Sequence, residues 1–77
     1  MTETVESRVR QILEAEHGVD EIGVSQPLES AGLDSLDRVE LWMQLEEVFG
    51  LPETDPEVED RCQTVGQICA YVERKIR

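Results

Sequence analysis

The sequence predicts an all-α protein: a four-helix bundle of three main helices and one short helix, with a long loop between helices 1 and 2. Three observations lead to this prediction. Apolar residues recur at helical spacing in three separate stretches, residues typical of helix ends stand at the borders of these stretches, and no β-hairpin signal is present. The 77 residues have room for one domain, which we expect to cover residues 1–77.

The first helix should begin after Thr2 or Thr4, because a threonine side chain can cap the free N–H groups at a helix start. Gly18 favours an end near His17, since glycine is the common residue just beyond a helix. The apolar face of this helix is formed by Val5, Val9, Ile12 and Leu13.

Residues 19–33 predict a loop, because they contain several glycine, serine and proline residues and no sustained period. Val24, Leu28 and Leu33 are the expected apolar anchors of this loop. Such a long connection in a small domain is either functional or a strap that closes over the core.

The second helix should begin at Asp34 or Ser35 and end at Phe49, where Gly50 stops it. In the segment "LPETDPEVEDRC", Pro56 suits the first position of a short third helix. Thr64 should cap the last helix. The apolar face of that helix is formed by Val65, Ile68, Cys69, Val72 and Ile76.

The composition disfavours several classes of function. The chain holds 7 Lys and Arg against 18 Asp and Glu, a net charge of −11, so nucleic acids and anionic membranes should be repelled. The acidity is explained either by solubility or by attraction to basic partners. A chain this small favours a binding, carrier or adaptor module over an enzyme.

Other features point to a reducing compartment. The chain has no signal-peptide pattern and no apolar run of membrane-spanning length, so we expect a cytoplasmic monomer without membrane insertion. Cys62 and Cys69 should be reduced thiols in the core, and one histidine with no CxxC pattern predicts no metal site.

The second helix has two apolar faces, although a small bundle needs only one. At about 100° per residue, Leu41, Leu45 and Phe49 share one face with Val48, and Trp42 lies at its edge. We assign the first three to the core.

The opposite stripe of the second helix, Leu36, Val39 and Met43, should then remain exposed, with Glu40 and Glu47 beside it. An exposed apolar stripe rimmed by acids is typical of a partner-binding surface. The alternative is that the long loop covers it. Glu46 and Glu47 stand near the helix end that disfavours acids, which again favours basic partners.

Ser35 stands in the first turn of this helix. Taken alone, it is best explained as a helix cap, and Asp34 is an equally good one. No GxSxG motif surrounds it and His17 belongs to another helix, so no catalytic residues are predicted. A phosphate attached there would be favoured by the helix dipole and by free N–H groups.

The stretch "GLDSLDRVELWMQLEEVFGL" resembles the acyl carrier protein family, whose hallmark is a Gly-x-Asp-Ser-Leu run opening the second helix. Here the run is Gly32, Asp34, Ser35 and Leu36. Further matching positions are Asp37, Val39, Glu40, Leu41, Met43, Leu45, Glu46, Glu47 and Phe49 in the helix, with Leu28, Thr64 and Val65 outside it. The resemblance covers essentially the whole chain.

The resemblance implies a carrier without catalytic activity. Ser35 would carry covalent 4′-phosphopantetheine, flanked by Asp34 and Leu36, and the thiol of this arm would hold acyl groups as thioesters. The implied partners are a phosphopantetheinyl transferase and acyl-loading and acyl-processing enzymes with basic docking patches. Their docking residues would be Asp37, Val39, Glu40, Met43 and Glu47.

Departures from the family pattern leave the cargo open. Arg38 places a positive charge near Ser35, and Trp42 is bulkier than the usual aliphatic residue there. Fatty-acid, polyketide, other lipid and aminoacyl pathways therefore stay open. One alternative to a carrier is an unmodified acidic adaptor that docks through the Leu36 stripe. The other is a calcium-binding protein, but this sequence contains no EF-hand loop.

Overall fold

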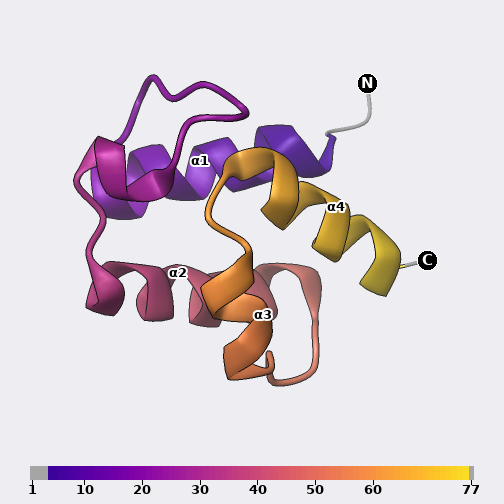
Figure 1. The fold of residues 1–77 in the computed structure, drawn as a ribbon. Helices are drawn as coiled ribbons and strands as arrows, with labels where there is room; N and C mark the ends of the chain where they lie inside the picture. The colour runs from indigo at the N-terminus through magenta and orange to yellow at the C-terminus, as the bar shows by residue number, and fades with distance from the viewer. Residues whose placement is uncertain (1–3, 77) are drawn as a thin grey trace.

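The computed structural model describes residues 4–76 and is all-helical, as predicted. Its elements are α1 (Val5–His17), the short 3₁₀ helix η1 (Leu28–Ala31), α2 (Ser35–Phe49), α3 (Pro56–Arg61) and α4 (Val65–Lys75). Helix α1 packs against both α2 and α4, and the short α3 packs against α2 (Figure 1). The described residues form no strand, only one isolated β-bridge between Pro27 and Thr64.

The predicted helix ends are confirmed by their caps. The side chains of Thr4, Asp34 and Thr64 accept backbone N–H bonds in the first turns of α1, α2 and α4. Gly18 and Gly50 end α1 and α2 with φ angles of 69° and 65°, a left-handed conformation that glycine adopts without strain. Thr2, the other candidate cap of α1, lies outside the described residues.

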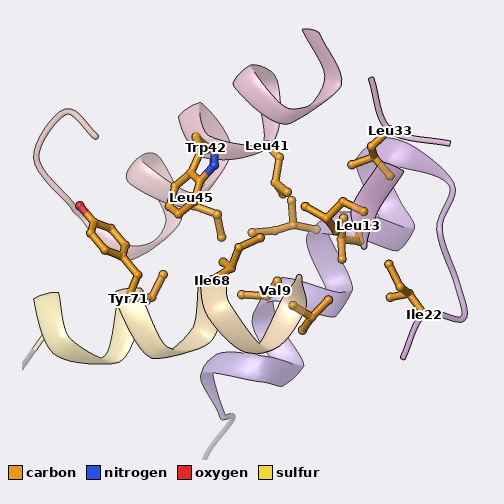
Figure 2. Packing of buried hydrophobic residues seen from close by; sticks show 13 residues of the cluster. Val9, Leu13, Ile22, Leu33, Leu41, Trp42, Leu45, Ile68 and Tyr71 are labelled. Atoms are coloured by element: carbon orange, nitrogen blue, oxygen red, sulfur yellow. The ribbon is translucent and has the colours of Figure 1, made fainter. Parts of the chain in front are cut away.

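One hydrophobic core joins the three long helices and the loop that precedes α2 (Figure 2). Its buried members are Val9, Ile12, Leu13, Ile22, Leu28, Leu33, Leu41, Trp42, Leu45, Val65, Ile68, Tyr71 and Val72. Phe49 is only half-buried and packs against this core, so its predicted place in the core is only partly correct.

The loop from α1 to α2 straps across the core, but not with all of the predicted anchors. Leu28 and Leu33 are buried as predicted. The prediction for Val24 was wrong: its side chain is about half exposed, and Ile22 is the buried anchor instead. The backbone of Val24 instead anchors this part of the loop to α4, because its carbonyl accepts a hydrogen bond from the Gly66 N–H at 3.0 Å.

Two aromatic side chains depart from the predicted faces. Trp42 was placed at the edge of the core and is completely buried. Its ring meets the ring of Tyr71 from α4 edge to face, with centroids 5.5 Å apart (Figure 2). Tyr71 thus joins the core, whereas Ile76, predicted on the apolar face of the last helix, is about half exposed at its C-terminal end. The buried face of α2 is wider than the helical period predicts, because α2 packs against α1 and α3 and its Trp42 also contacts Tyr71 of α4.

The remaining sequence predictions concern the cysteines and the membrane. Cys62 and Cys69 are free thiols and both are partly buried. In residues 4–76 we find no helix with the length and apolar character needed to span a bilayer.

Candidate functional site

Ser35 is the first residue of α2, and buried side chains fix the chain just before it. Leu28 and Leu33 both point into the core, on either side of a sharp turn. Gly32 forms that turn with a φ of 96°, and its N–H donates to the Glu29 carbonyl at 3.0 Å. Only glycine adopts this backbone conformation without strain. The turn therefore delivers Ser35 to the surface at a defined place.

The segment before Ser35 is also tied to the link between α3 and α4. The Leu28 N–H donates to the Gln63 carbonyl at 2.8 Å, next to the bridge between Pro27 and Thr64. Residues far apart in the sequence thus form one support beneath the start of α2.

Two carboxylates close the N-terminus of α2. The Asp37 N–H donates to Asp34 Oδ1 at 2.9 Å, and the Asp34 N–H donates to Asp37 Oδ2 at 3.2 Å, which makes a capping box. The hydrogen bond from the Asp37 N–H is the main reason that the pKa of Asp34 lies below its ordinary value. Asp34, predicted to flank the cofactor, therefore acts as the cap of the helix.

The Ser35 side chain is exposed and borders two small surface hollows. The first has a volume of about 270 Å³ and is lined by Glu29, Leu33, Asp34, Ser35 and Arg38. The second has a volume of about 90 Å³ and is lined by Ser35, Arg38, Val39, Glu59 and Asp60. No hydrogen bond engages the Ser35 hydroxyl within residues 4–76, so it is free to be esterified.

Within residues 4–76, no side chain that could act as a general base is hydrogen-bonded to the Ser35 hydroxyl. His17 is engaged elsewhere, with its Nε2 hydrogen-bonded to Gln44 Oε1 at 2.9 Å between α1 and α2. In the described part of the chain, no group of three or more His, Cys, Asp or Glu side chains is arranged to hold a metal ion.

The predicted apolar stripe of α2 is exposed. Leu36, Val39 and Met43 have 73%, 44% and 61% of their surface accessible, and the loop does not cover them. The long loop instead packs toward the core through Leu28 and Leu33. A row of exposed apolar side chains beside Ser35 is what a partner-binding surface requires.

The acids near the stripe divide into two groups. Glu40 and Glu47 are exposed, whereas Asp37 is half-buried and bonded within the capping box. Glu46, whose position near the helix end also favours basic partners, has a structural role in addition. Its Oε2 accepts the Thr54 N–H at 2.7 Å, so this carboxylate holds the loop that follows α2.

Nothing in the sequence indicates that acids of α3 border Ser35. Glu59 and Asp60 reach the second hollow because α3 packs against α2. Partial burial, followed by the negative charge of Glu46, raises the pKa of the Glu59 carboxyl. No spacing pattern announces this contact, because it depends on how two helices pack.

Comparison with known proteins agrees with this geometry. Residues 7–72 match the family model described as "Phosphopantetheine attachment site". An acyl carrier protein of Thermotoga maritima is 38% identical over 77 residues, covering 96% of this chain and 94% of that protein. A crystal structure of an acyl carrier protein from Thermotoga maritima superposes with a TM-score of 0.79 at 21% identity, covering 91% of this chain and 84% of that one. At this identity the superposition supports the fold alone.

Proposed function

Because the chain belongs to the acyl carrier protein family, we propose that Ser35 is the residue that bears its covalent 4′-phosphopantetheine. Members of this family are carriers and not catalysts. The bound cofactor supplies a thiol that holds acyl groups as thioesters. We propose that residues 1–77 act as a single carrier domain.

One observation carries the choice of Ser35: its free, exposed hydroxyl stands between two hollows at the start of α2. The nearest serine in the chain is less suited. That serine, Ser30, donates its hydroxyl to the Pro27 carbonyl at 2.7 Å and also accepts a hydrogen bond from Gln26. The residues around Ser35 therefore fit a phosphodiester-linked arm that leaves the surface beside α2.

We propose that the exposed stripe Leu36, Val39 and Met43 is the docking surface for partner enzymes. The chemistry of its surroundings favours basic partners, because Glu40 and Glu47 are exposed and the whole chain carries a charge of −11. Charges at the rim of an interface mainly accelerate association. Fast, weak contacts suit a carrier that must visit a phosphopantetheinyl transferase and several acyl-loading and acyl-processing enzymes in turn.

The cargo belongs to fatty-acid, polyketide or related biosynthesis in this proposal, which rests on the family resemblance of α2. The filled core constrains that cargo. Trp42, Leu41 and Leu45 are completely buried, so an acyl chain that enters the core between α2 and α4 must displace them. The monomeric state and the cytoplasmic location stay predictions.

Mass spectrometry of the intact protein tests the attachment site. The purified apo-protein is incubated with coenzyme A and a broad-specificity phosphopantetheinyl transferase, beside Ser35→Ala and the matched control Ser30→Ala. We expect one phosphopantetheinyl increment on the wild type and on Ser30→Ala, and none on Ser35→Ala. An increment that survives in Ser35→Ala would place the arm elsewhere. No increment on any folded sample would favour the acidic adaptor.

A further inference from the structure

Three backbone N–H groups at the start of α2 are already engaged. A helix N-terminus usually offers its free N–H groups to a phosphate. Here the Asp37 N–H donates to the Asp34 carboxylate, the Asp34 N–H donates to the Asp37 carboxylate, and the Arg38 N–H donates to the Asp34 carbonyl at 3.0 Å. A phosphate group on Ser35 would meet two carboxylates at this helix end instead of an open set of donors.

The hollows beside Ser35 add further negative charge. Glu29 lines the first with Asp34, while Glu59 and Asp60 line the second. A phosphodiester on Ser35 brings one more negative charge into this ring of acids. Like charges this close repel one another, so a local positive charge would stabilise the ester-linked phosphate against the protein surface.

Arg38 is the one cation that lines these hollows, and it lines both of them. It stands three residues after Ser35, so the two side chains leave neighbouring positions on the same side of α2. Arg10 is held by Glu6 at 2.9 Å, whereas the described residues place no carboxylate oxygen within 4.0 Å of the Arg38 guanidinium. The planar, permanently charged fork of arginine suits phosphate oxygens.

We propose that Arg38 is a positioning residue for the arm, whose guanidinium binds the phosphodiester on Ser35 and holds the first part of the arm against α2. This inference rests on the proposed attachment at Ser35. It explains why a positive charge stands within an acidic surface. It also assigns the binding of the phosphate to a side chain, because the capping box already occupies backbone N–H groups at this helix end.

Nuclear magnetic resonance of the loaded protein tests this contact without any enzyme assay. The first readout is the Nε–Hε signal of Arg38 in the loaded wild type, compared with the same signal in Ser35→Ala. The second is the phosphorus-31 signal of the phosphodiester in loaded wild type, Arg38→Gln and Arg74→Gln. Arg74 lies in the last turn of α4, which is far from the start of α2 (Figure 1), so its replacement makes the same change in charge away from Ser35.

We expect the Arg38 Nε–Hε signal to shift on loading and the phosphorus signal to shift in Arg38→Gln but not in Arg74→Gln. Both shifts should shrink at about 1 M salt, where the Debye length falls to about 3 Å. Arg38→Lys should keep part of the phosphorus shift, since it retains the charge and loses the fork.

Three results would overturn the inference. In the first, the intact mass confirms loading while the Arg38 signal does not shift on loading and the phosphorus signal does not shift in Arg38→Gln. In that case the attachment at Ser35 is supported and the proposed role of Arg38 is refuted. If those signals stay unchanged while Arg38→Gln alters the association with a partner enzyme, the guanidinium serves an acidic group on that partner. If the wild type gains no mass, the attachment proposal fails and the role of Arg38 fails with it.

Discussion

Replacing Leu41 or Met43 by alanine distinguishes the roles of the two apolar faces of α2. Leu41 is completely buried in the core, whereas Met43 lies on the exposed stripe. Truncating a buried leucine to alanine typically costs about 2–5 kcal/mol of the free energy of unfolding, through lost burial and the cavity left behind. A surface substitution changes it by less than about 0.5 kcal/mol.

The magnitude for Leu41→Ala is large relative to the whole protein. At roughly 0.05–0.15 kcal/mol per residue, this chain has a total stability of about 4–12 kcal/mol. A loss of about 3 kcal/mol corresponds to a fall in Tm of roughly 12–24 °C for a domain of this size. Met43→Ala should leave the Tm within a few degrees of the wild type.

The docking role predicts the reverse order for partner binding. We expect Met43→Ala to raise the KM of the phosphopantetheinyl transferase for the carrier about fivefold, a loss of about 1 kcal/mol that is common for an interface side chain. Thermal and urea unfolding followed by circular dichroism give the stabilities. The control Leu41→Met keeps the core filled and should cost less than about 1.5 kcal/mol.

Two outcomes would refute this reasoning. A fall in stability for Met43→Ala comparable to that of Leu41→Ala would mean that the stripe is packed in the native protein. An unchanged KM for Met43→Ala, at full stability, would remove Met43 from the docking surface of that partner.

The remaining predictions concern pH and thiol reactivity. The pKa of Asp34 is lowered in the folded state, so its charge contributes stability above the ordinary carboxyl pKa of 3.8, and this contribution disappears as the pH falls through the lower folded value. Thermal unfolding from about pH 7 to about pH 3 should therefore show the wild type losing its advantage over Asp34→Asn on acidification, and a difference in Tm that is constant with pH would contradict this. Burial raises the pKa of Cys69 to about 11, so only about one thiol in a thousand is ionised at about pH 8. Iodoacetamide should modify Cys69 in the native protein far more slowly than in the unfolded protein, as peptide mass spectrometry can measure, and equal rates in the two states would show that the thiol is accessible.

Local signals were sufficient to predict the helices. The ends of α2 depend on Asp34, which bonds a backbone N–H three residues later, and on Gly50, which adopts a left-handed φ. Both effects act over one turn, so they can be read in the sequence. The exposed stripe beside Ser35 was predictable for the same reason, because the helical period separates it from the core face.

The packing of the helices decided which side chains are buried where the helical period alone did not specify it. Trp42 is buried because Tyr71 of α4 meets its ring, and Ile22 replaces Val24 as a core anchor because of the path that the loop takes to α2. The helical period gives the direction of a side chain from its own helix. It does not specify which other element lies in that direction.

The sequence by itself determined the helix order, the capped start of α2 and the serine that stands there. Only the tertiary structure decided the surroundings of that serine: it placed Glu59 and Asp60 of α3 on one side and, within residues 4–76, gave Arg38 no carboxylate partner. The reason is that hydrogen bonds within a helix turn join residues three or four positions apart. The part of the charge around Ser35 that Glu59 and Asp60 supply comes instead from a contact between two helices, and these acids lie more than twenty positions from Ser35 in the chain.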